Sequence, residues 1–203
     1  MNTKLNGKHI AILVTEGFEQ VELTGPKEAL EKAGAQVDIV SPAGESVRAW
    51  DLTKWGKTFP VDVPLKKAKT QDYDALVLPG GVMNPDKLRM DKKAVDFVRG
   101  FFNERKPVAA ICHGPWTLIE AQVVEGRRMT SWPSLQTDLR NAGAEWVDEQ
   151  VVVDDGLVTS RKPADIPAFN RKIIQEFATQ PAHHEFVTVE GAPPLASSGA
   201  AYP

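Results

Sequence analysis

The chain is short of cysteine, of long apolar runs and of excess positive charge. One cysteine among 203 residues excludes an intrachain disulfide, so a reducing, cytoplasmic location is the expectation. No apolar run approaches the roughly 20 residues that cross a bilayer, and the first residues lack the pattern of a secretion signal. Lys and Arg total 24 against 27 Asp and Glu, a net charge of −3. We therefore expect neither membrane association nor nucleic-acid binding.

Motifs for nucleotide cofactors and for metals are missing as well. The sequence contains neither Gly-x-Gly-x-x-Gly nor Gly-x-x-x-x-Gly-Lys-[Ser/Thr], and we expect no cofactor. Four histidines and one cysteine provide no closely spaced ligand pair other than His183-His184, and we expect no metal site.

What is present is an alternation of short apolar runs and amphipathic segments. It predicts buried strands at 9–14, 36–41, 75–78 and 107–111, and helices at 21–33, 93–102, 115–124, 134–142 and 163–178. It also predicts edge strands at 47–52 and 59–65 around Trp55-Gly56, and short strands at 144–147, 151–154 and 157–160. Strand, helix and strand in succession imply parallel pairing. We expect an α/β fold, a doubly wound, mostly parallel sheet sandwiched by helices with a small antiparallel addition.

The chain divides into two parts by composition. Residues 1–180 form the predicted α/β domain, and residues 181–203 form an extension rich in Pro, Ala and Ser and without Lys or Arg.

Three polar loops follow three of the predicted parallel strands. They are Glu16 to Glu19, Gly80-Gly81, and Cys112-His113-Gly114. Because the carboxyl ends of parallel strands meet at one edge of the sheet, we expect these loops to form one site.

Cys112 lies where a buried strand runs directly into a helix, which is the layout of a nucleophile elbow. A helix N-terminus favours a negative sulfur and predicts a lowered thiol pKa. The alternative is an inert cysteine at a strand end. Adjacent His113 either exchanges the proton of the thiol or only shapes the turn. The backbone N–H groups after Pro79, with that of His113, are candidates for an oxyanion hole.

A carboxyl group aimed at the sulfur has three candidates, Glu16, Glu19 and Glu22. Desolvation would raise the pKa of such a carboxyl, which could then donate a hydrogen bond to a thiolate. The pattern alone leaves the three open.

Together these residues resemble the PfpI branch of the ThiJ/PfpI superfamily, which contains intracellular cysteine peptidases and protein deglycases and is related to class I glutamine amidotransferases. The matching segments fall within residues 9–178 and are 16–23, 74–81, 106–115, 130–133, 142–148 and 158–165. The resemblance implies a flavodoxin-like sheet, with Cys112 as nucleophile, His113 as the histidine beside it, and Glu19, in preference to Glu16, as the protonated carboxyl in contact with it.

The resemblance also implies roles around this centre. Gly81 and His113 would supply the oxyanion-hole amides, and Gly80 and Trp132 would border the pocket. In peptidase-like relatives a Glu from a neighbouring subunit completes a triad, which implies a homo-oligomer, a dimer at least. Here the nearest match to that Glu is Asp86, whose side chain is one methylene shorter.

Three functions remain open. One is a stress-protective, Cys-dependent hydrolase that removes glyoxal or methylglyoxal adducts from Cys, Lys and Arg. Another is an intracellular peptidase acting on small peptides, and the third is a non-enzymatic redox or stress sensor working through oxidation of Cys112. Asp86 in place of the triad Glu favours the adduct-removing hydrolase over the peptidase. His183-His184-Glu185 matches the His-x-Glu of glutamine amidotransferases, but its place in the extension indicates coincidence.

Overall fold

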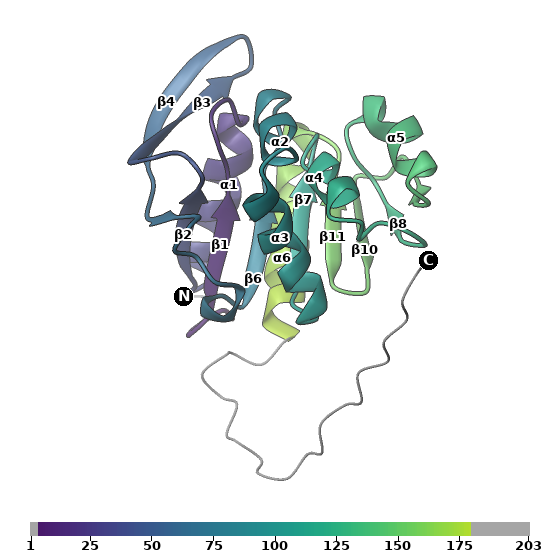
Figure 1. Cartoon of the computed structure of the whole chain (residues 1–203). Helices are drawn as coiled ribbons and strands as arrows, with labels where there is room; N and C mark the ends of the chain where they lie inside the picture. Colours follow the sequence, from purple (N-terminus) through teal and green to yellow (C-terminus); the bar gives the residue numbers. More distant parts are fainter. Residues whose placement is uncertain (1–3, 180–203) are drawn as a thin grey trace, which may run out of the picture.

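A computed structural model describes residues 4–179, in which a seven-stranded sheet is packed between two layers of helices (Figure 1). The strand order is β10 (Val151–Asp154), β11 (Leu157–Ser160), β7 (Val108–Ile111), β6 (Ala75–Leu78), β1 (His9–Leu13), β2 (Gln36–Ser41) and β5 (Val63–Pro64). Every neighbouring pair is parallel except β10 with β11. The predicted fold class is confirmed. Residues 181–203, with His183-His184-Glu185, lie outside the described residues.

The central strands are continuous apolar runs because helices cover both of their faces. On β1, Ile10 and Ile12 join the core formed with α1 (Gln20–Lys32) and α6 (Ile166–Thr179). Ala11 and Leu13 point the other way, into the core formed with α3 (Lys92–Asn103) and α4 (Pro115–Glu120). The two cores pack against opposite faces of the sheet, and this packing fixes the positions of the strand ends that precede the polar loops.

The antiparallel hairpin of β3 (Ser46–Asp51) and β4 (Lys54–Pro60) stands beside the sheet (Figure 1). The predicted turn at Trp55-Gly56 is wrong, because the chain reverses at Leu52 and Thr53. Trp50 pairs with Trp55 across the hairpin, with ring centroids 5.5 Å apart, edge to face, and this contact fixes the register. The end of the predicted strand at 59–65 pairs instead with β2, as β5.

The helices differ from the predictions in three places. The helix predicted at 115–124 ends at Glu120, because Gln122 takes a left-handed φ of 57° and stops it. A short helix, α2 (Met83–Leu88), was not predicted, and Pro85 lies in its first turn, where proline is tolerated. The helix predicted at 134–142 is a 3₁₀ turn followed by α5 (Gln136–Asn141).

The remaining elements are a parallel pair, β8 (Arg128–Met129) and β9 (Glu145–Trp146), and 3₁₀ turns at Thr70–Asp72 and Pro163–Asp165. No helix within residues 4–179 combines the length and the apolar character needed to cross a membrane.

Candidate active site

A pocket of about 480 Å³ opens at the carboxyl edge of the sheet, where the loops after β1, β6 and β7 meet. Five of the residues predicted for the site line it: Glu19, Gly81, Cys112, His113 and Trp132. The prediction that Gly80 also lines the pocket is wrong, because Gly80 packs behind it against Cys112 and Glu22. The predicted convergence of the three loops on one site is therefore what the structure shows.

Cys112 forms a strained turn between β7 and α4. Its φ is 61°, a left-handed value that is uncommon for a side chain other than glycine and is the expected conformation of a nucleophile elbow. Two backbone hydrogen bonds hold the turn: Cys112 N donates to Ser160 O at 3.0 Å, and Trp132 N donates to Cys112 O at 2.9 Å. Gly114 completes the bend, since a Cβ there would lie 2.6 Å from Leu78 O. The turn projects the sulfur above the sheet edge, where the side chain is 6% exposed.

Two backbone N–H groups point at the sulfur, those of Gly81 and His113. The first is brought there by the Gly80-Gly81 turn, which packs directly on the elbow. A Cβ at Gly80 would lie 2.6 Å from Cys112 Cβ and 2.8 Å from His113 N, and Gly81 has a φ of 73°. Glycine is required at both positions. The sulfur thus lies between the two amides that were predicted to form an oxyanion hole.

The carboxyl in contact with the sulfur belongs to Glu22 and not to Glu19. Glu22 is fully buried in the first turn of α1, its side chain hydrogen-bonds with Cys112, and its Oε2 accepts from Gly80 N at 2.8 Å. The assignment of this contact to Glu19 was wrong because Glu19 is the N-cap of α1 and has an extended backbone, whereas Glu22 lies a turn further on. The available signal was a charged residue in the otherwise apolar stripe that Leu23 and Leu30 form on this helix.

Burial raises the pKa of Glu22 to about 8, although the hydrogen bond from Gly80 N acts to lower it. The carboxyl is therefore mostly protonated at neutral pH. Its second oxygen, Oε1, is buried and has no hydrogen-bond partner among the described residues.

The expected lowering of the thiol pKa by a helix N-terminus is also wrong. Burial, followed by the charge of an ionised Glu22, raises the pKa of the Cys112 thiol, while the amides of Gly81 and His113 oppose the rise. Because Glu22 ionises only around pH 8, its charge is largely absent at neutral pH. Under those conditions a thiolate meets only donors, the two amides and the Glu22 hydroxyl.

His113 lies beside the sulfur, with Nδ1 3.2 Å from Cys112 Sγ. Burial lowers the pKa of His113 to about 4, so the ring is neutral at pH 7 and can accept the thiol proton. Its Nε2 lies 3.4 Å from Ser134 Oγ, and its ring stacks on Trp132 at 5.8 Å between centroids. Within residues 4–179 no carboxylate hydrogen-bonds to His113.

The other carboxyl groups that were predicted for the site do not contact the Cys112 sulfur. Glu19 lines the wall of the pocket, and its Oε1 accepts from Leu52 N at 3.4 Å. Glu16 accepts from Arg48 N at 3.2 Å and anchors the hairpin. Asp86 is exposed on α2 and does not line the pocket of its own chain, so a catalytic role for it requires a second copy and stays a prediction.

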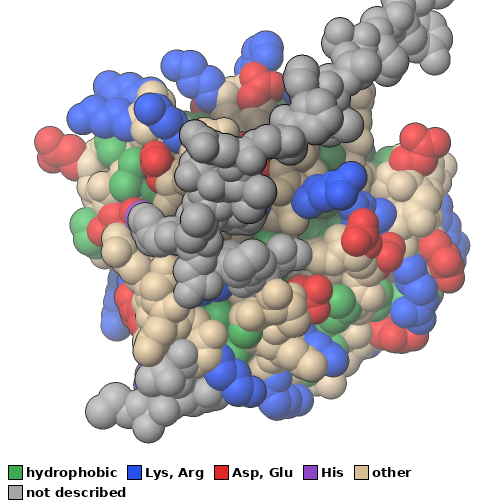
Figure 2. Space-filling view, turned by 90° about the horizontal axis from the view of Figure 1, so that it is seen from below, with side chains coloured by type: hydrophobic (Ala, Val, Ile, Leu, Met, Phe, Trp, Pro, Cys, Tyr) green, Lys and Arg blue, Asp and Glu red, His purple; other side chains and the backbone are tan. Residues whose placement is uncertain are grey.

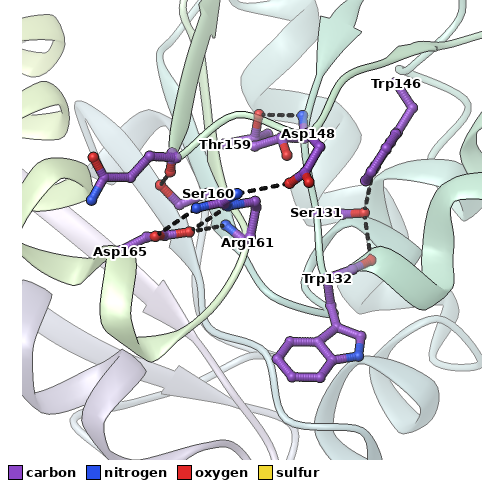
Figure 3. Close-up of polar contacts among 10 residues, drawn as sticks. Ser131, Trp132, Trp146, Asp148, Thr159, Ser160, Arg161 and Asp165 are labelled. Atoms are coloured by element: carbon purple, nitrogen blue, oxygen red, sulfur yellow. Dashed lines mark hydrogen bonds and ion pairs between the residues drawn. The ribbon is translucent and has the colours of Figure 1, made fainter.

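The part of the pocket wall near Pro163 is supported by an ion-pair cluster that was not predicted from the sequence (Figure 3). Arg161 binds Asp165 through two contacts of 2.9 and 3.2 Å and binds Asp148 at 2.7 Å. Arg161 directly follows Ser160, whose carbonyl holds the elbow, and precedes Pro163, which lines the pocket. The cluster therefore fixes the segment that supports both the elbow and the wall.

A second set of contacts in Figure 3 supports Trp132 at the mouth of the pocket. Ser131 Oγ donates to Trp132 O and accepts from Trp146 Nε1, both at 2.9 Å. Within residues 4–179 no cluster of three His, Cys, Asp or Glu side chains is placed to bind a metal ion.

A parallel α/β sheet that carries a cysteine on a left-handed strand-to-helix turn, beneath a pocket, defines an α/β protein of the nucleophile-elbow class. The chain belongs to the DJ-1/PfpI family, whose profile matches residues 8–176.

Relatives in this family have several names. The chain is 45% identical to Protein/nucleic acid deglycase 2 of Escherichia coli over 170 residues, which cover 83% of this chain and 96% of the relative. It is 44% identical over 168 residues to General stress protein 18 of Bacillus subtilis, covering 82% and 95%. It is 42% identical over 166 residues to the putative cysteine protease YraA of the same organism, covering 81% and 95%.

Among solved structures, DJ-1beta of Drosophila melanogaster superposes with a TM-score of 0.77 at 28% identity, covering 88% of this chain and 94% of that one. The recognition of a PfpI-type chain from its motifs is confirmed, and the names of its relatives support hydrolase chemistry in the family.

Proposed function

We propose that the protein is a Cys112-dependent hydrolase that removes glyoxal or methylglyoxal adducts from side chains or small molecules. One observation carries the proposal. The sulfur lies in a pocket of about 480 Å³, between the Gly81 and His113 amides and against the protonated carboxyl of Glu22. Such a pocket suits a short α-dicarbonyl fragment, and its donors suit the oxyanion that forms when sulfur adds to a carbonyl carbon.

The first step follows from these positions. The sulfur attacks the carbonyl carbon, the thiol proton passes to His113 Nδ1, and the carbonyl electron pair moves to the substrate oxygen, which the amides beside the sulfur would then stabilise. Overall, a methylglyoxal adduct takes up one water and yields the free side chain and lactate. One carbon is oxidised to a carboxylate while its neighbour is reduced to an alcohol, so the reaction needs no external oxidant or reductant.

Peptide hydrolysis is the second candidate, favoured by the relative named as a putative cysteine protease. It needs a histidine that stays protonated long enough to donate to a leaving amine, which an acidic partner normally ensures. His113 hydrogen-bonds to no carboxylate within residues 4–179, and burial lowers its pKa to about 4. This weighs against a peptidase unless a second copy brings Asp86 to the site.

The proposal extends to the location, the biological role and the oligomeric state of the protein. We place the protein in the cytoplasm in a stress-protective role, which is supported by its single cysteine and by its similarity to General stress protein 18. We also propose a homo-oligomer, in which the exposed Asp86 of one copy is available to another.

The test is release of lactate and free thiol from N-acetylcysteine that has been treated with methylglyoxal. We expect release by the unmodified protein and none above background by Cys112→Ala. Equal release by the two proteins would disprove the proposal. A fluorogenic aminoacyl amide, assayed in parallel, identifies a peptidase if it alone is cleaved.

A further inference from the structure

The charges that line the pocket are of one sign. Two carboxyls, Glu19 and Glu22, and one imidazole line it, with no Lys or Arg among the lining residues. At neutral pH Glu22 is mostly protonated and His113 is neutral. Glu19 is then the remaining titratable side chain that lines the pocket in the part of the chain that the structure describes, and no cation among the lining residues offsets its charge when it ionises.

Glu19 is held by backbone groups and not by a cation. It accepts hydrogen bonds from the N–H groups of Leu52 and Gln20, and nearby Asp51 adds a second negative charge. No ion pair joins Glu19 to a Lys, Arg or His within residues 4–179. The side chain is 8% exposed, so its charge is largely removed from water without being neutralised.

A carboxylate in this state gains from a cation that enters the pocket. Burial raises the pKa of Glu19, which reports the cost of its desolvated charge, and a positive group beside it offsets that cost. The rings of Trp50 and Trp132 also line the pocket, and an indole face attracts cations. An anionic group beside Glu19 meets repulsion instead.

We infer that Glu19 makes the pocket selective for substrates in which the adduct is attached to a positively charged group, a guanidinium or an ammonium, over adducts on neutral or anionic thiols. This inference rests on the proposed function and names its substrate class. An adduct on an arginine side chain keeps the positive charge, whereas an adduct on a thiol has none. Glu19 acts here as a residue for specificity, while the reacting groups remain at the sulfur.

The sole cysteine allows the charge selection to be measured without any turnover. Cys112 is titrated with two methanethiosulfonate reagents of similar size, one ending in a trimethylammonium group and the other in a sulfonate. We expect the cationic reagent to react faster with the unmodified protein, and Glu19→Gln to lower the ratio of the two rates roughly tenfold.

Two variants provide the controls. Glu45→Gln makes the same change of charge at an exposed residue just before β3 that does not line the pocket, and it should leave the ratio unchanged. Glu19→Asp keeps the charge and should keep most of the preference. A ratio that Glu19→Gln leaves unaltered would overturn the inference, as would a similar fall in Glu45→Gln.

Turnover separates this inference from the function on which it rests. Methylglyoxal adducts of N-acetylarginine amide and N-acetylcysteine amide are compared in the unmodified protein and in Glu19→Gln. We expect the arginine adduct to lose its advantage in the variant, mainly through a higher KM. If neither adduct is consumed, the proposed function fails while the reagent ratio still tests the electrostatic selection. If both are consumed with the same preference in the two proteins, the selectivity assigned to Glu19 is wrong.

Discussion

The floor and the wall of the pocket are built in different ways. The floor, defined as Cys112 and Glu22 together with the adjoining Gly80, which does not itself line the pocket, is held by the ends of β6 and β7 and the first turn of α1. The wall, defined here by Leu52 and Trp132, comes from surface turns, and these side chains are 70% and 38% exposed. Backbone geometry fixes the floor, whereas exposed side chains shape the wall.

This difference assigns reactivity and selectivity to separate parts of the chain. A change in the floor disturbs the sulfur itself, because every group there lies in contact with it or with its turn. A change in the wall alters which molecules reach the sulfur and leaves the elbow in place. Substitutions in the two parts should therefore differ in kind as well as in size.

The largest effect is expected for Gly80→Ala, which breaks the floor. The added Cβ would lie 2.6 Å from Cys112 Cβ and 2.8 Å from both Glu22 Oε2 and His113 N, so the elbow must shift. A displacement of about 1 Å costs on the order of 100-fold in rate. The measurements are kcat with the methylglyoxal adduct and the rate of Cys112 alkylation. Gly44→Ala is the matched control, since nothing lies within 4 Å of its added Cβ, and an equal loss in both variants would refute the steric argument.

A smaller effect, with a defined pH dependence, is expected for Glu22→Gln. The pKa of Glu22 in the folded protein, about 8, exceeds the ordinary value of 4.5 expected in the unfolded chain, so between these values the unfolded chain binds fewer protons than the folded one. The stability of the unmodified protein should therefore fall as pH rises through this window, by roughly 1 kcal/mol per pH unit from this group. Glutamine cannot ionise, and the variant should gain stability relative to the parent from pH 5 to pH 8.

Urea denaturation at these two pH values measures the effect. Glu45→Gln changes an exposed position, so its free energy of unfolding should match that of the unmodified protein at both pH values. A constant difference between Glu22→Gln and the parent would show that Glu22 is ionised throughout.

The smallest effect is expected for Trp132→Ala, which alters the wall alone. The substitution removes the ring that stacks on His113 but keeps the backbone N–H that donates to Cys112 O. An aromatic contact of this kind contributes about 0.5 to 1.5 kcal/mol, which corresponds to a rise in KM of roughly two- to tenfold. Trp132→Phe should retain most of the contact. Alkylation of Cys112 by iodoacetamide should change little, and a loss as large as in Gly80→Ala would place Trp132 in the floor.

Much of the fold could be predicted because its central strands are short apolar runs bounded by turn residues. Residues 36–41, 75–78, 151–154 and 157–160 were predicted with the bounds that the structure shows. The hairpin turn at Leu52 and Thr53 was missed because neither residue is a typical turn former, and the pairing of Trp50 with Trp55 decides the register. Contacts across strands are not visible in a local pattern.

The site was predictable to the extent that the backbone determines it. Cys112 and the two glycines before Val82 follow strand ends, and parallel strands bring such ends together. The choice between Glu19 and Glu22 depended on where α1 begins, because a shift of three residues turns a side chain from the pocket wall to the sulfur. The pairing of Arg161 with Asp165 is local, since the two stand four residues apart, whereas its contact with Asp148 depends on tertiary packing and had no local signal.

The two hydrogen bonds that flank Cys112 tie its bend to segments distant in the chain, one ending at Ser160 and the other at Trp132. If either neighbour detaches, the peptide units around the bend relax and the thiol becomes open to solvent. The rate at which this single thiol is labelled therefore reports on local opening of the native state. The rate of Cys112 labelling can be followed by mass spectrometry without any added tag, and it measures how often this part of the fold opens.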